Sequence, residues 1–265
     1  MGLLPLETGG EGYHAPSPDD FTLPPLFPDV PWLAWLDKYM LQAIVATILI
    51  IIFWLVMARK RQMVPGKGQF IGETAYFFVR NSIARDNLGH DFRKFLPWLI
   101  ALFSFILINN LWGIFPFTLM PTTAHAGWAY GLAIMVWVVY NGVGIAKHGF
   151  GGYLKLATLP AGVPVFMWWL IIPLEFFSNI IVRPVTLALR LFANMLAGHI
   201  LLILFALGGE YLLVHGEGLV KPVGIVAWLM FIVIAFLELL VQALQAYVFT
   251  LLSALYISGA IAEEH

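Results

Sequence analysis

The chain has 265 residues, of which 61% are hydrophobic and only 11% are charged, and its mean hydropathy is +0.87. A water-soluble globular domain cannot absorb this apolar excess, so the composition predicts an integral membrane protein of the all-α class. The net charge of −1 excludes a basic surface for nucleic acid, and the absence of cysteine excludes disulfides, thiolate metal sites and a cysteine nucleophile.

The N-terminal segment, residues 1–37, is acidic and rich in proline. It has no basic region ahead of an apolar core, so it is not predicted to be a signal peptide. We expect this segment to lie outside the membrane, on the outer side, and residues 38–265 to form one membrane domain.

Three segments have the length of a simple membrane crossing. A membrane helix needs about 20 apolar residues to cross a hydrocarbon core of about 30 Å. Residues 39–58, 96–115 and 128–146 meet this requirement. Residues 69–92 mix apolar with charged residues, which predicts an amphipathic helix that lies in the membrane interface.

Two later segments, residues 164–207 and 222–260, are longer than one perpendicular crossing requires. At ~1.5 Å per residue, a continuous helix over either segment would be roughly 60 Å long. Each segment can be a hairpin of two short helices, a helix that continues into water, or one steeply tilted helix. The lack of a polar turn and of charged ends favours strong tilt, and Pro173 and Pro184 are candidate kinks in the earlier segment. The fold expected is therefore about five transmembrane helices plus an interfacial helix.

Basic residues set the predicted orientation. With the N-terminus outside, five crossings place the C-terminus in the cytoplasm. The outer side then holds only Lys38 and Lys221, whereas the cytoplasmic side holds Arg59, Lys60, Arg61, Lys67, Arg80, Arg85, Arg93, Lys94, Lys147 and Lys155. No internal repeat is visible, which argues against a transporter built from inverted repeats.

The two remaining arginines, Arg183 and Arg190, stand inside a predicted membrane segment. An arginine at the centre of a membrane helix costs at least ~2.5 kcal/mol, so such a residue faces a protein interior or a wet cavity. For Arg190, which apolar residues flank on both sides, this cost predicts a function. For Arg183, nearer the predicted cytoplasmic end, a function and a snorkelling side chain are equally good explanations.

Polar and small residues recur at three- and four-residue spacing on both long segments, which places them on one face of each helix. The two faces suggest a shared hydrophilic seam, although amides and hydroxyls also join membrane helices without further function. The members are Arg183, Thr186, Arg190, Asn194, Ala197 and Gly198 on the first segment, and Glu238, Gln242, Gln245, Ser253 and Tyr256 on the second.

The ionisable residues of these faces can do different chemistry. Histidine titrates near neutrality and a buried glutamate can be shifted there, so His199 and Glu238 can pass protons between water and the membrane interior. Arginine keeps its proton, so Arg190 can act only as a fixed charge, ~13 Å further from the outer side than His199. Glu175 and Glu238 are the candidate carboxylates within the membrane. If Glu238 is committed to His199, the partner of Arg190 can come from another subunit.

The segments RPVTLALRLFANMLAGH and LELLVQALQAYVFTLLSALYISGAIAEEH closely resemble subunit a of the F-type ATP synthases, the stationary part of a membrane rotary motor. The resemblance extends from the first span to the C-terminus. It implies that Arg190 faces an ion-carrying carboxylate on a rotating ring of c subunits, with Asn194 and Gln245 also in the proton-translocating site. It further implies that His199 and Glu238 line the outer proton path. Weaker candidates for this site are Glu175, Arg183 and Gln242.

The resemblance also implies a non-catalytic, multi-pass subunit of the bacterial plasma membrane, without a cofactor or metal. Its partners would be the c-ring, the b-subunit stator stalk and the other ATP synthase subunits. Protons would pass Glu238 and His199 from outside, neutralise a ring carboxylate, and leave by a cytoplasmic half-channel, which couples their flow to ring rotation and ATP synthesis. Arg190 would keep the passing carboxylate ionised and block a direct leak.

The rival hypothesis is a self-contained ion or anion transporter in which Arg190 binds an anionic substrate. Co-purification with a ring and ATPase subunits would distinguish the first hypothesis from this one. An intramembrane hydrolase is a third possibility, but the sequence offers no nucleophile paired with a base.

Overall fold

The computed structural model describes residues 16–17, 23–24, 26, 36–59, 66–115, 118, 120–159, 165–218 and 220–262. Most of the predicted N-terminal segment, together with Lys60, Arg61 and Pro164, lies outside these ranges. Every regular element within them is a helix, which confirms the all-α prediction.

Five helical runs in the described ranges are long and apolar enough to cross a membrane, which confirms the predicted number. They are Lys38–Arg59, Lys67–Leu111, Ala126–Thr158, Trp168–His215 and Val220–Ile261.

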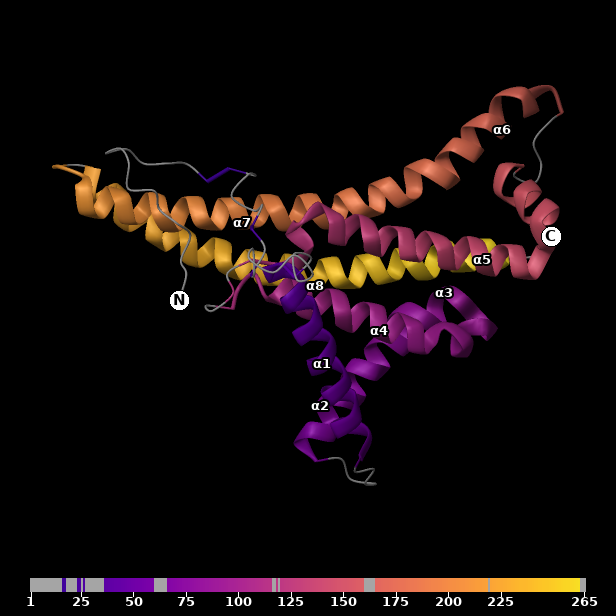
Figure 1. The fold of residues 1–265 in the computed structure, drawn as a ribbon, viewed down its shortest axis with the longest axis horizontal. Coiled ribbons are helices and arrows are strands. Elements are labelled where there is room, and N and C mark those ends of the chain that lie inside the picture. Colours follow the sequence, from indigo (N-terminus) through magenta and orange to yellow (C-terminus); the bar gives the residue numbers. More distant parts are fainter. Residues whose placement is uncertain are drawn as a thin grey trace.

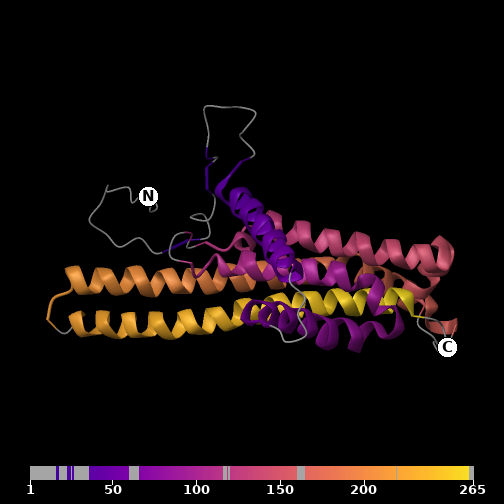
Figure 2. The same ribbon diagram turned by 90° about the horizontal axis from the view of Figure 1, so that it is seen from below.

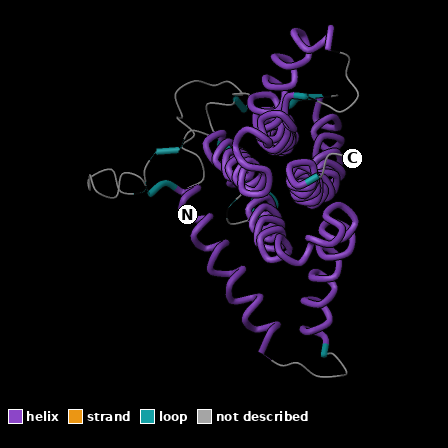
Figure 3. Tube along the Cα trace, turned by 90° about the vertical axis from the view of Figure 1, so that its right-hand side faces the viewer, coloured by secondary structure: helices purple, strands orange, loops and turns teal. Residues whose placement is uncertain are grey.

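The two C-terminal helices run along the longest dimension of the molecule. α7 (Arg183–His215) and α8 (Val220–Ile261) run antiparallel and side by side, and α5 (Ala126–Thr158) and α4 (Phe92–Leu111) pack along them (Figures 1 and 2). Seen end-on, these helices gather around a common centre (Figure 3). The largest apolar side chains buried there include Leu99, Ile106, Leu187, Leu191, Met195, Phe249 and Ile257.

The first helix, α1 (Lys38–Arg59), runs steeply across the long axis of this bundle (Figure 1). Only its beginning is buried against the other helices, at Tyr39, Gln42, Ala43 and Ala46. Its length of ~33 Å suits one perpendicular crossing of a membrane. If α1 crosses the membrane perpendicularly, then α7 and α8, which run across α1, are strongly inclined to the membrane normal. This arrangement favours the predicted tilt of the two long helices, which stays a prediction.

The predicted interfacial helix at residues 69–92 is helical but irregular. It consists of α2 (Lys67–Phe78), the π-helical η3 (Val79–Arg85), α3 (Asp86–Leu88) and the 3-10 turn η4 (Gly89–Asp91). Gly89 has a φ of 53°, a conformation that favours glycine, and there the chain reverses into α4. Val79, Ile83 and Ala84 are buried in the bundle core, so this segment has a protein-facing side. Its position in the interface stays a prediction.

Two helices end at other residues than the predicted membrane spans. The helix over the span predicted to end at residue 115 ends at Leu111, and the chain continues as turns, in which the Gly113 N–H donates to the backbone oxygen of Asn110 at 3.0 Å. The span predicted over 128–146 continues to Thr158. Its last turns follow a sharp reversal at Gly149, where φ is 72°.

The long segment predicted over 164–207 is one helical run from Trp168 to His215, so it is not a hairpin and ends later than predicted. α6 (Trp168–Phe177) passes into α7 through the π-helical η7 (Ser178–Val182). Pro184 has no N–H to donate to the preceding turn, which accounts for the change of helical register just before it. Figure 1 shows the helix bending there, between the two predicted kink sites. The second long segment is likewise continuous, as α8.

The reversal in α5 packs the Tyr153 ring against Gly144, and this contact can be tested through protein stability. A Cβ at Gly144 would overlap the Tyr153 ring, and the Tyr153 hydroxyl donates a 2.9 Å hydrogen bond to Oδ1 of Asn141. We expect Gly144→Ala to displace this ring and to destabilise the protein by about 1–3 kcal/mol. The matched control is Gly142→Ala, because a Cβ at Gly142 meets nothing within 4 Å. Thermal unfolding of the detergent-purified protein measures both, and equal melting temperatures would contradict the packing.

Candidate functional site

His199 and Glu238 face each other across the interface of α7 and α8. Nδ1 of His199 lies 3.7 Å from Oε1 of Glu238, and the two side chains are only 1% and 3% exposed. This distance suits an ion pair when the imidazole is protonated, and it is longer than a direct hydrogen bond. The two titratable groups proposed from the sequence therefore lie together in a buried position.

A chain of buried polar groups leads away from Glu238. Gln242 Nε2 donates to Oε1 of Glu238 at 3.3 Å, and Asn110 Nδ2 on α4 donates to the backbone oxygen of Gln242 at 3.2 Å. Thr123 Oγ1 then donates to Oδ1 of Asn110 at 2.5 Å. Oε2 of Glu238 has no hydrogen-bond partner in the part of the chain that the structure describes. The carboxylate is thus linked on one side to the segment between α4 and α5, and its other oxygen can accept a proton.

The same segment reaches the beginning of α1. Thr122 Oγ1, in the 3-10 turn η5 (Thr122–Ala124), donates to Oε1 of Gln42 at 3.3 Å. Sequence reasoning missed Asn110, Thr122, Thr123 and Gln42. The adjacent asparagines at 109 and 110, inside an otherwise apolar span, were the signal that could have identified this polar chain.

Arg190 lies on the other side of α7. It precedes His199 by nine residues, which at ~100° per residue turns it to the opposite face of the helix. Its side chain is exposed, and it forms no hydrogen bond or ion pair with any residue in the described ranges. Ala193, Asn194 and Ala197 are exposed on the same face. The arginine therefore points out of the bundle, over a surface of small residues.

The predicted polar faces of α7 and α8 meet only in part. Asn194 Nδ2 donates to Oε1 of Gln245 at 3.0 Å, which joins the exposed face of α7 to the buried face of α8. The hydroxyls of Thr186 and Ser253 are bound within their own helices, to the carbonyls of Val182 and Phe249. The seam proposed from the sequence is thus made by two cross-helix pairs, Asn194–Gln245 and His199–Glu238.

Arg183 lies against an aromatic side chain. Its guanidinium lies 5.4 Å from the centroid of the Tyr256 ring, which in turn contacts Tyr140 at 5.6 Å. Tyr140 donates to the backbone oxygen of Asn179 at 2.8 Å, and Asn179 Nδ2 donates to Oε2 of Glu175 at 3.4 Å. This second polar cluster joins α5, α6, η7, α7 and α8. Sequence reasoning missed Tyr140 and Asn179 in it.

The fold and the site together define a multi-pass membrane protein with a buried imidazole–carboxylate pair and a separate outward-facing arginine. Within the described ranges, no group of three or more histidine, aspartate or glutamate side chains could hold a metal ion.

The chain belongs to the ATP synthase A chain family, whose model matches residues 40–258. It is 56% identical over 264 residues to ATP synthase subunit a of Nocardioides sp. strain ATCC BAA-499 / JS614, with 97% of this chain and 96% of the relative covered. The subunit a of Pseudarthrobacter chlorophenolicus is 45% identical over 266 residues, with 99% and 98% covered. That of Streptomyces lividans is 38% identical over 262 residues, with 97% and 90% covered. These findings confirm the resemblance to subunit a and its association with ATP synthesis, proton transport and the other ATP synthase subunits.

The contact between Asn194 and Gln245 can be tested by a double-mutant cycle. Asn194→Ala, Gln245→Ala and the double variant should reveal a coupling free energy of about 0.6 kcal/mol, the average for hydrogen bonds between membrane helices. Thermal unfolding of the detergent-purified protein supplies the values. Strict additivity of the two single changes would show that the amides do not interact.

Proposed function

We propose that the chain is the stationary proton-translocating subunit of a rotary ATP synthase. It forms two half-channels against a ring of c subunits and couples proton flow to ring rotation and ATP synthesis. The observation that carries the proposal is Arg190, a fixed cation on an outward face of a membrane helix, without a carboxylate partner in the part of the chain that the structure describes.

The position of Arg190 calls for an anion from another subunit. An arginine exposed to lipid at this depth costs at least ~2.5 kcal/mol, which a carboxylate on an adjacent helix would offset. Ala193 and Ala197, exposed on the same face, allow a neighbouring helix to approach closely. A carboxylate on each c subunit would meet the guanidinium as the ring turns.

The outer half-channel is proposed to end at Glu238 and His199. Both can exchange protons, and the buried chain through Gln242, Asn110 and Thr123 links Glu238 to the segment between α4 and α5. The orientation inferred from the basic residues places this segment on the outer side. Protons would arrive there and move on to a ring carboxylate.

The second half-channel is proposed to follow the cluster of Glu175, Asn179, Arg183, Tyr140 and Tyr256. These side chains lie near the beginning of α7, on the predicted cytoplasmic side. Arg190 lies between them and His199 along the helix. They combine a carboxylate with hydroxyl and amide groups, which suits a hydrated path in a membrane protein.

Arg190 would separate the two half-channels because it cannot release its proton at physiological pH. A proton could then cross only on a ring carboxylate, which forces the ring to turn. In this scheme the subunit is non-catalytic, spans the bacterial plasma membrane with its N-terminus outside, and is held against the ring by the b-subunit stalk.

Substitution of Arg190 tests the proposal. We expect Arg190→Ala to reduce ATP-driven proton pumping by inverted membrane vesicles to the background of vesicles without the complex. Lys221→Ala, which removes a charge from the exposed start of α8, is the control and should pump like the unaltered protein. Co-purification of the ring and ATPase subunits checks assembly. Proton-coupled ATP synthesis at unaltered rates in Arg190→Ala would refute the proposal, and a functional protein that purifies alone would support a self-contained transporter.

An exchange of the buried pair tests the outer path. His199→Glu and Glu238→His each place two like groups together, and each should lower ATP synthesis at least about tenfold. The double exchange restores one imidazole and one carboxylate at the same position, so it should recover much of the activity. ATP synthesis driven by an imposed proton gradient measures all three. A double variant no better than the worse single one would show that the two residues do not act as a pair.

A further inference from the structure

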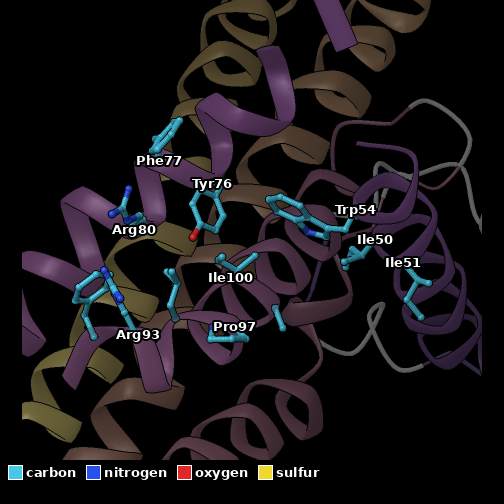
Figure 4. A pocket seen from close by; sticks show the side chains of 12 residues that line it. Ile50, Ile51, Trp54, Tyr76, Phe77, Arg80, Arg93, Pro97 and Ile100 are labelled. Atoms are coloured by element: carbon cyan, nitrogen blue, oxygen red, sulfur yellow. The ribbon is translucent and has the colours of Figure 1, made fainter. Parts of the chain in front are cut away.

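An open apolar cleft of about 940 Å³ lies between α1, α2 and the first turns of α4 (Figure 4). Ile50 and Trp54 of α1 line one wall, and Leu96, Pro97 and Ile100 of α4 line another. Its volume falls within the range of about 300–1,000 Å³ that is usual for small-molecule sites. None of its lining residues belongs to the proposed proton path.

Two arginines, Arg80 and Arg93, mark one end of this cleft. Arg80 lies 5.9 Å from the Phe77 ring centroid and 5.8 Å from that of Phe92, and Arg93 lies 5.9 Å from the same Phe92 ring. Within the described ranges, neither guanidinium forms an ion pair or a hydrogen bond. The rings therefore hold two cations near each other while their N–H groups stay available to an anion. The Tyr76 hydroxyl points into the same space (Figure 4).

The cleft is too short for a partner helix that crosses the membrane. On α4 its lining runs from Phe92 to Ala101, a rise of at most ~14 Å against a hydrocarbon thickness of about 30 Å. Just beyond Ala101, Trp54 Nε1 on α1 donates a 3.2 Å hydrogen bond to Oγ of Ser104 on α4, and this bond joins the two walls of the cleft. A molecule that occupies a single leaflet fits these dimensions.

We propose that this cleft binds one anionic phospholipid. The headgroup phosphate lies between Arg80 and Arg93, and the acyl chains lie against Ile50, Trp54 and Ile100. The lipid comes from the leaflet on the side where α1 ends at Arg59, the cytoplasmic leaflet in the predicted orientation. It fills the space that α1 leaves where it diverges from the bundle.

The first test compares lipid binding to the intact, detergent-purified ATP synthase complex by native mass spectrometry, with phosphatidylglycerol and phosphatidylcholine as probes. Arg80→Gln combined with Arg93→Gln should weaken phosphatidylglycerol binding about 25-fold, from roughly fivefold for each basic residue, and leave phosphatidylcholine binding unchanged. The matched control, Arg85→Gln combined with Lys94→Gln, removes two exposed charges from the same elements outside the cleft. Equal effects of the two double variants would overturn the proposal.

The second test works even if the double variant fails to assemble. A photoreactive benzophenone amino acid replaces Ile100, which points into the cleft (Figure 4), in an otherwise unaltered complex. Illumination should add the mass of a phospholipid to this chain. A crosslink to another polypeptide would identify the cleft as a protein-docking site and overturn the proposal, and so would the absence of any adduct.

Discussion

A polar group inside a bilayer must find its partner within the protein, and the arrangement of α7 and α8 follows from this constraint. α8 turns its polar residues into the bundle, where Glu238, Gln242 and Gln245 are each at most 5% exposed. Its outward side chains are apolar, and Phe236 and Leu240 are 71% and 62% exposed. The helix is thus polar toward its neighbours and apolar toward lipid, the reverse of a surface helix in a soluble protein.

Arg190 is the exception to this constraint, because its guanidinium has no hydrogen-bond or ion-pair partner in the part of the chain that the structure describes. His199 lies nine residues further along α7, on the opposite face, where it meets Glu238. The Arg190 guanidinium therefore points away from the bundle, and the His199 imidazole points inward. In the proposed mechanism this separation keeps the guanidinium from pairing with Glu238 and leaves it for a carboxylate that arrives from outside the chain.

The order of polar groups along α7 supports two separate half-channels. Arg183 with its tyrosine neighbours lies at one end, His199 lies toward the other, and Arg190 lies between them. Other helices contribute polar side chains at each end. Asn110 of α4 belongs to the chain that leads to Glu238, and Tyr140 of α5 belongs to the cluster around Arg183. Because α1 crosses the bundle axis steeply (Figure 1), strong inclination of α7 in the membrane would spread these groups sideways along the surface that a ring would pass.

The sequence by itself determined the number of membrane helices and the residues Arg190, His199 and Glu238 as functional candidates, because hydropathy, helical spacing and the cost of a buried charge are local properties. Two helices end at other residues than the predicted spans, at Leu111 and, beyond the reversal at Gly149, at Thr158. Only the tertiary structure decided which polar groups meet. Asn110 and Gln242 are 132 residues apart, and no periodicity in one segment specifies its register against another. Such partners are set by the packing of the whole bundle, which also determines that Arg190 points outward while His199 points in.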